Sequence, residues 1–246
     1  MGLRKERLMS PGPPLSCRNC AIGGGTIYRN VHRHAPDQVT AARTCIKTVA
    51  AGHFLLRQGD IPDAIYSVYS GWLCRVREIA GGRKQILNFI IPGDVITYST
   101  LFIPGQKLSY GVRTISNVEL CSFDAKNLTQ LMHRRPEFLE PYHRDLAEYL
   151  EAVTCRLADL GQQSAKARLG HLFADLYRRH EKRGMVSGGG FDLPASQEIL
   201  ANKLGMTKAY LNRALGLLRR ERIISLEAGR LHIHSLEKLD KFAEGS

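Results

Sequence analysis

Short apolar runs separated by turn residues dominate the chain from His53 to Tyr98. The breaks between the runs are Gln58-Gly59-Asp60, Ser70-Gly71, Ala80-Gly81-Gly82 and Pro92-Gly93-Asp94. We therefore expect strands near residues 53–57, 64–69, 72–78, 85–91 and 95–98. Strands that recur at this spacing, with turns between them, favour a sandwich or barrel over alternating strands and helices.

After Cys121 the apolar residues follow a helical period. The seam positions, apolar except for His143, alternate steps of four and three as in a coiled coil: Leu139, His143, Leu146, Leu150, Val153, Leu157 and Leu160. Charged residues flank this seam, and Gly161 marks its end or a hinge. The pattern predicts a long helix that pairs with a second copy of the chain. Packing of the helix on its own domain is the alternative.

An amphipathic helix is expected over residues 164–182, and a glycine-rich connection over residues 184–190 follows it. The pattern after this connection predicts two short helices. Ser196 suits the N-cap of the first short helix, and Thr207 suits that of the second. Gly205 supplies the left-handed residue of the turn between them. The inward positions are apolar: Ile199, Leu200, Leu204, Leu211, Ala214, Leu215 and Leu218. This spacing predicts a helix-turn-helix.

The exposed side of the second short helix is basic near its N-terminal end, which is the end of a recognition helix that enters the major groove. Arg213 can donate a bidentate pair to guanine, and Lys208 can bond a base or a phosphate. A hairpin, or wing, is expected over residues 223–234. The predicted DNA-binding residues are Ser196, Thr207, Lys208, Ala209, Tyr210, Asn212 and Arg213. The alternative is that two helices of a hydrophobic core show this spacing by chance and do not bind DNA.

The charge of the chain supports a polyanionic partner at its C-terminal end. The formal net charge is +12, with six Lys and Arg against two Asp and Glu in residues 1–40, fourteen against twelve in residues 41–163, and fifteen against nine in residues 164–246. A basic C-terminal third suits DNA, although a solvated basic surface is the alternative. No apolar stretch is long enough to span a membrane or resembles a signal peptide, so we expect a cytoplasmic protein with no membrane partner.

Six scattered cysteines argue against a disulfide framework in such a chain. Cys74 and Cys155 are expected to be buried apolar residues. The chain has no nucleophile elbow, phosphate loop or HExxH motif, so we do not expect an enzyme. Apart from His32 and His34, we expect the histidines to lie on the surface.

These motifs together resemble the CRP/FNR family of bacterial transcription regulators over nearly the whole chain. The turn glycines of residues 58–60, 70–71 and 92–94 and the segment over residues 196–218 carry the resemblance. It implies an α+β protein with an N-terminal β jelly-roll sensor domain like the cyclic-nucleotide-binding domains, a long dimerisation helix and a C-terminal winged helix-turn-helix. The expected parts are an arm (1–40), the sensor domain (41–135), the dimerisation helix (136–162) and the DNA-binding domain (163–246). The resemblance also implies a homodimer on a palindromic site in double-stranded DNA and contact with RNA polymerase.

Two departures from the family pattern concern the ligand and the operator. The cyclic-AMP-binding members carry a Glu for the ribose and an Arg-Ser pair for the phosphate, where this chain has Tyr98 and Leu108-Ser109. Lys107 would point to the opposite face of a strand, so we do not expect cyclic AMP to bind. Ala209 replaces a Glu that is common on the recognition helix, and loss of that carboxylate should alter the operator.

Cys17-Arg18-Asn19-Cys20 resembles the start of the iron–sulfur motif of the family's oxygen sensor, and Cys121 matches the position of its distant ligand. Thr26 occupies the place of the third N-terminal ligand, so Cys45, His32, His34 or an exogenous thiol would have to complete a cluster. The cysteines thus indicate an iron–sulfur cluster, a redox-active thiol pair or chemically silent residues. Our leading hypothesis is a regulator that responds to oxygen or redox state. The second is a constitutive, effector-independent DNA-binding protein whose β-roll is only a dimerisation scaffold.

Overall fold

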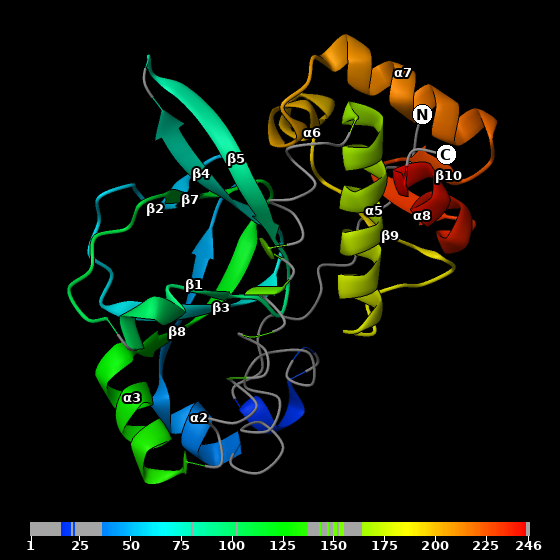
Figure 1. Ribbon diagram of the computed structural model, residues 1–246. Coiled ribbons are helices and arrows are strands. Elements are labelled where there is room, and N and C mark those ends of the chain that lie inside the picture. The colour runs from blue at the N-terminus through cyan, green and yellow to red at the C-terminus, as the bar shows by residue number, and fades with distance from the viewer. Residues whose placement is uncertain are drawn as a thin grey trace, which may run out of the picture.

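The computed structural model describes residues 16–20, 22, 36–79, 81–101, 103–136, 143, 147, 150–151, 153–154 and 164–244. Within these residues a β-roll lies beside a second, mainly helical domain (Figure 1). Most of the dimerisation helix expected over residues 136–162 falls outside the described residues, and residues 143, 147, 150–151 and 153–154 within it are helical. Most of the arm over residues 1–40, including Thr26, His32 and His34, also falls outside the described residues, as does Cys155.

Two antiparallel four-stranded sheets form the β-roll. The first has the order β1 (Arg43–Val49), β8 (Val118–Asp124), β3 (Ala64–Ser70) and β6 (Val95–Ile96). The second has the order β2 (Phe54–Leu56), β7 (Gly111–Thr114), β4 (Leu73–Ile79) and β5 (Arg83–Ile90). Alternate residues of the strands point between the sheets and fill the interior with Tyr66, Val68, Leu73, Ile90, Ile96, Val112, Val118 and Leu120. The predicted sandwich is confirmed.

The turn residues explain why the strands end where they do. Gly71 has φ +80°, and a Cβ at this position would lie 2.1 Å from the carbonyl oxygen of Asn117, so no side chain fits. The strand expected over residues 95–98 is wrong beyond Ile96, because Thr97 has φ +64° and the 3₁₀ helix η3 (Tyr98–Leu101) follows. Strands β1, β7 and β8 were not predicted from the pattern.

Two helices and a 3₁₀ turn cover the outer face of the first sheet. They are η1 (Cys17–Asn19), α2 (Pro36–Ala42) and α3 (Ala125–Arg134). Their apolar side chains and those of the sheet form a second cluster that contains Cys17, Val39, Ala42, Ile65, Val95, Cys121, Phe123, Leu128 and Met132. The N-terminal cysteine segment is therefore packed against the β-roll.

The second domain contains α5 (Ala165–Glu181), α6 (Gln197–Leu204), α7 (Lys208–Arg220) and α8 (Leu236–Glu244). Its small antiparallel sheet has the order β10 (Ile224–Glu227), β11 (Arg230–Ile233) and β9 (Gly190–Asp192). The helix expected over residues 164–182 is confirmed, and Ser164 caps it by accepting from the amide of Ala167 at 3.1 Å. The glycine-rich connection ends in a strand that was not expected. No helix in the described part of the chain is long and apolar enough to cross a membrane.

One apolar core joins the two domains. Cys74, Val76, Ile86 and Phe89 on the outer face of the second sheet belong to the same cluster as the core of the second domain. Cys74 is buried there, as expected, with 4% of its surface exposed. His180 was expected on the surface, but it is only 4% exposed, because its ring stacks on Trp72 at 5.4 Å and on Phe191 at 4.2 Å between ring centroids.

An ion-pair network at the edge of this core ties Asp94 to α5. Arg183 Nη2 lies 2.6 Å from Asp94 Oδ1, and Arg179 Nη2 lies 2.5 Å from Asp94 Oδ2. Burial by itself would raise the pKa of Asp94, but the two guanidinium groups and the amide of Ile91 hold that pKa below its usual value. Removal of one partner would leave uncompensated buried charge, so the network fixes α5 against the β-roll.

The buried His180 gives the stability of the protein a defined pH dependence. Burial lowers the pKa of His180 from 6.5 to about 4. As the pH falls below 6.5, the imidazole of His180 takes up a proton in the unfolded chain, whereas in the folded chain it stays neutral down to about pH 4. The free energy of unfolding therefore has its full value above pH 6.5 and decreases as the pH falls toward 4. The decrease is about 2–3 kcal/mol between about pH 7 and about pH 4.5.

His180→Phe should keep the ring stack and remove the part of this loss that the imidazole causes. The free energy of unfolding, measured with urea at several pH values for both proteins, checks the prediction. Equal slopes in the two proteins between pH 6.5 and pH 4 would contradict it.

Candidate DNA-binding surface and cysteine cluster

Helices α6 and α7 form the predicted helix-turn-helix. Ser196 Oγ accepts from the amide of Ile199 at 3.3 Å, and Thr207 Oγ1 accepts from the amide of Tyr210 at 3.2 Å. Gly205 between the helices has φ +61° and ψ +39°, the left-handed conformation that its lack of a side chain permits. The hydroxyls of Ser196 and Thr207 are thus used as N-caps, and both residues lie on the exposed side of the motif.

The two faces of α7 differ in polarity. Its inner face buries Leu211, Ala214, Leu215 and Leu218, as the sequence predicted. At its N-terminal end Lys208, Ala209, Asn212 and Arg213 are exposed, and Tyr210 is half-buried. The guanidinium carbon of Arg213 lies 5.5 Å from the centre of the Tyr210 ring, a cation–π contact along the helix surface. The structure therefore brings the predicted reading residues together on one exposed, basic helix end.

The C-terminal end of α6 is bound to the backbone of β5, an edge strand of the second sheet. Asn202 Oδ1 accepts from the amide of Ile86 at 2.8 Å, and Asn202 Nδ2 donates to the carbonyl of Lys84 at 2.7 Å. Lys203 Nζ donates to the carbonyl of Leu87 at 2.7 Å. These bonds satisfy backbone groups that an edge strand would otherwise leave open. Sequence reasoning missed them, because an Asn more than 110 residues from its partners carries no local signal.

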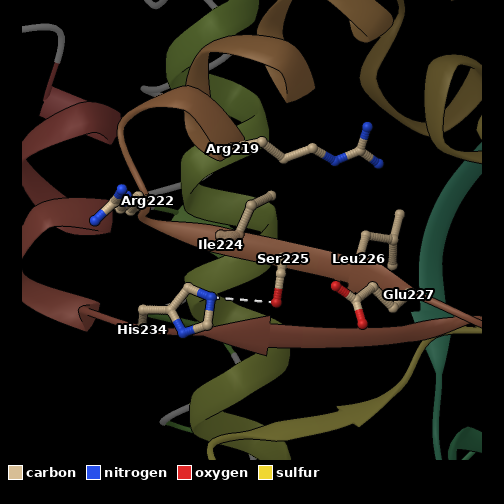
Figure 2. A pocket seen from close by; sticks show the side chains of 7 residues that line it. All are labelled: Arg219, Arg222, Ile224, Ser225, Leu226, Glu227 and His234. Carbon is tan, nitrogen blue, oxygen red and sulfur yellow. Dashed lines mark hydrogen bonds between the residues drawn. The ribbon is translucent and has the colours of Figure 1, made fainter.

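The wing is the hairpin of β10 and β11, turned through Ala228 and Gly229, which both have positive φ. This turn confirms the predicted hairpin. An open depression of about 600 Å³ lies beside it, lined by Arg219, Arg222, Ile224, Ser225, Leu226, Glu227 and His234 (Figure 2). His234 Nε2 and Ser225 Oγ, both in this lining, lie 3.1 Å apart. The guanidinium groups of Arg219 and Arg222, also in the lining, add positive charge next to the wing.

Cys17, Cys20 and Cys121 converge on the outer face of the first sheet. Cys17 is 5% exposed and Cys121 is 7% exposed, and both belong to the cluster under α2. The amide of Cys17 donates to Thr40 Oγ1 at 2.9 Å, and an ion pair of 2.8 Å joins Arg18 to Asp37. These contacts anchor η1 to α2 and so hold the Cys-x-x-Cys segment near Cys121.

The electrostatics of Cys121 reflect this convergence. Burial raises the pKa of the Cys121 thiol, the Arg43 guanidinium at 3.9 Å opposes that shift, and the neighbouring Cys17 and Cys20 add to it. Burial also raises the pKa of Tyr69, with further contributions from Cys20, Glu119 and Cys121. The three thiols and the Tyr69 hydroxyl therefore share one electrostatic environment.

Cys45 is not brought into this group. It is exposed on β1, and it pairs in register with Ser122, the neighbour of Cys121 on β8. Successive residues of a strand point to opposite faces, so Cys45 lies on the other side of the sheet from Cys121. The pKa of Tyr66, an interior residue, is raised mainly by burial; Asp63 and then Cys45 add smaller increases. Within the described residues, no three His, Cys, Asp or Glu side chains are arranged to hold a metal ion.

A buried apolar side chain, Leu108, occupies the position that matches the phosphate-pairing arginine of cyclic-AMP-binding proteins. Leu108 is 6% exposed, and its backbone is bonded to Asp60 and Gly59 at 2.9 and 2.8 Å. Leu108 and Lys107 lie outside a strand, so the strand geometry expected for them is wrong. The expectation that cyclic AMP does not bind stays a prediction.

This architecture, a β-roll fixed to a winged helix-turn-helix, defines a DNA-binding transcription regulator. Residues 46–135 match the family of cyclic nucleotide-binding domains, and residues 167–242 match the Crp-like helix-turn-helix domains. The chain belongs to the CRP/FNR family of transcription regulators.

Similar curated proteins include two regulators. The transcriptional activator protein FnrL of Cereibacter sphaeroides is 26% identical over 224 residues, which cover 88% of this chain and 86% of FnrL. The fumarate and nitrate reduction regulatory protein of Escherichia coli K12 is 22% identical over 238 residues, which cover 97% of this chain and 94% of that protein.

Solved structures with the same fold include FixK2 from Bradyrhizobium japonicum, with a TM-score of 0.70 and 18% identity over 80% of this chain and 96% of FixK2. A CooA mutant from Carboxydothermus hydrogenoformans has a TM-score of 0.67 and 16% identity over 89% of this chain and 95% of CooA. At these identities the likeness concerns the fold alone. It agrees with the α+β architecture that the sequence predicted.

Proposed function

We propose that this chain binds a palindromic DNA site as a homodimer and that the redox state of its cysteine cluster controls that binding. The observation that carries the DNA-reading part is the exposed basic end of α7, held outward by a fully apolar inner face. Helices of this design place their N-terminal residues against base edges, while surrounding basic residues bond phosphates.

Arg213 is the residue we propose for base recognition. Its guanidinium is exposed, and its contact with the Tyr210 ring restricts its orientation. A planar guanidinium matches the two acceptors of guanine in the major groove. Ala209 offers no carboxylate to a cytosine amino group, so the operator should differ from those read by family members with Glu at this position.

The homodimer is supported by the few described residues of the predicted seam. His143, Leu150 and Val153 are helical, and Leu150 is 55% exposed in the single chain. An apolar side chain at a seam position gains most when a second helix covers it. Two copies would then present two α7 helices to successive major grooves. Contact of this dimer with RNA polymerase is part of the proposal.

An iron–sulfur cluster is the cofactor that the cysteine motif suggests, and the described residues do not fit one. Such clusters are usually held by four thiolates. Here three thiols share one site, Cys45 lies on the opposite face, and no metal-holding arrangement occurs in the described part of the chain. We therefore assign the redox response to the thiols themselves. Oxidation of two thiols by hydrogen peroxide forms one disulfide and releases two water molecules, so two electrons pass from sulfur to the peroxide oxygens.

A short chain of contacts connects these thiols with the DNA-binding domain. Cys121 pairs in register with Ser67 on β3, and the next residue, Val68, donates its amide to the carbonyl of Asp94 at 3.0 Å. Asp94 in turn holds Arg179 of α5 and Arg183, which follows the end of α5. We propose that a change of packing at Cys121 alters this network and so shifts the population of DNA-competent dimers.

Arg213→Ala should weaken specific DNA binding by about 1–3 kcal/mol, or about 5- to 150-fold, because a bidentate base contact is lost. Binding to unrelated DNA should change little. Lys238→Ala is the control, since Lys238 is exposed on α8 and carries the same charge. The Kd on a selected operator is the measurement. An unchanged Kd, or an equal loss in the control, would show that α7 does not read DNA as described.

Oxidation with peroxide should change the specific DNA affinity at least tenfold, and Cys121→Ser should abolish that change. Cys45→Ser is the matched control, because Cys45 lies on the opposite face of the same strand pair. A DNA affinity that does not change on oxidation would favour the constitutive, effector-independent protein. A response that is retained in Cys121→Ser would show that the cysteine cluster does not control DNA binding.

The same protein, supplied with iron and sulfide without oxygen, should show no visible charge-transfer band. A band that bleaches in air and disappears in Cys17→Ser would contradict the thiol mechanism and show that the chain senses oxygen through an iron–sulfur cluster.

A further inference from the structure

Strand β10 of the wing has a free edge. It is the end strand of the sheet β10–β11–β9, and within the described part of the chain no further strand pairs with it. Ile233 of β11 pairs in register with Ile224, but its amide donates to the carbonyl of Gly189, on the β9 side, at 3.0 Å. Backbone groups of antiparallel strands alternate between the two sides, so Ile224 and Leu226 direct their amides and carbonyls away from β11.

This free edge borders the open depression beside the wing (Figure 2). All four residues of β10 line the depression, although successive side chains of a strand point to opposite faces. The depression therefore follows the edge of the strand and not only one face of the sheet. An edge strand with open backbone groups is a template for pairing with another extended chain.

Two arginines without an ion pair stand beside this edge. Arg219 in the last turn of α7 and Arg222 in the connection to β10 both line the depression and are exposed (Figure 2). Among the described residues no acidic side chain pairs with either guanidinium. Arg222 also has φ +52°, a conformation that suits Gly or Asn better, so the turn by itself does not account for an arginine there. The acidic residue of the lining, Glu227, leaves the depression with a net positive charge.

We propose that the depression binds an extended acidic segment of a partner protein, which adds to the wing sheet as a fourth strand beside β10. The backbone of that segment pairs with the open amides and carbonyls of Ile224 and Leu226, and its carboxylates pair with Arg219 and Arg222. Alternate side chains of a strand share one face, so acidic residues two positions apart both meet the arginines.

A protein segment suits this place better than a DNA backbone does. Phosphates offer only acceptors, whereas the free edge presents both donors and acceptors, which another strand matches. The depression also lies at the C-terminal end of α7, about 20 Å along a helix of 13 residues from the end that carries Lys208. The segment can therefore bind while α7 holds DNA, and this site depends neither on base reading nor on the thiols.

Fluorescence anisotropy of a labelled short peptide of alternating glutamate and valine, added to the full-length protein, tests the site. A control peptide carries N-methyl groups on its amides, so it keeps the charge but cannot pair with a strand edge. The double variant Arg219→Gln, Arg222→Gln removes both guanidinium groups. Its matched control is Arg220→Gln, Lys238→Gln, because both residues are exposed, carry the same charge and lie outside the lining.

We expect saturable binding of the peptide to the unchanged protein and to the control variant. Binding to the Arg219→Gln, Arg222→Gln variant, and binding of the N-methylated peptide, should each be at least tenfold weaker. One equivalent of operator duplex should leave the peptide bound. Equal binding to the two variants, equal binding of the two peptides, or no saturable binding would overturn the proposal. Displacement of the peptide by the duplex would overturn it too and would assign the arginines to the DNA backbone.

Hydrogen exchange of the β10 backbone gives a second readout, which needs no variant. The Leu226 amide faces the free edge and should exchange at least tenfold more slowly with saturating peptide. The Ser225 amide, which faces β11, should change little. Exchange at Leu226 that the peptide leaves unchanged would show that charge alone holds the peptide, and would overturn the proposal.

Discussion

The outer face of the second sheet is apolar and cannot be left in water, and its burial against α5 and the wing sheet sets the arrangement of the whole molecule. Phe89 and Trp72 pack with Phe173 and Phe191 in one core, so the β-roll and the DNA-binding domain share their most hydrophobic surface. The Asp94 network at the rim makes this packing directional, because two guanidinium groups must meet one carboxylate. The orientation of α7 relative to the β-roll follows from that contact.

Three chemically distinct places lie on the elements that this core connects. The thiols sit on the outer face of β8, Arg75 and Asn88 lie between the sheets, and the basic residues lie at the N-terminal end of α7. Each of the first two is separated from the shared core by only one or two strands. In such an arrangement, small changes of packing in the β-roll can influence the DNA-binding domain, because closely packed interfaces shift between discrete arrangements instead of deforming continuously.

Local signals in the sequence predicted the helix-turn-helix well. Gly205, the two N-caps and the apolar spacing act within a few residues, and the wing turn at Ala228 and Gly229 does the same. Long-range pairings could not be predicted in this way. Strand β8 mixes Cys121 and Ser122 with apolar residues because both of its faces are covered, so no alternation appears. His180 reads as a surface residue until Trp72 and Phe191 enclose it, and Asp94 reads as part of a turn although its partners lie 85 and 89 residues further along.

The central claim is that two copies of this chain read two half-sites with α7, in an orientation fixed by the domain contact. Hydroxyl-radical footprinting on an operator selected from random DNA tests this arrangement. We predict two protected regions on one face of the duplex, with centres about 10 base pairs apart or a multiple of that distance, related by a two-fold axis. Protection of a single half-site, or uniform protection without sequence preference, would contradict it.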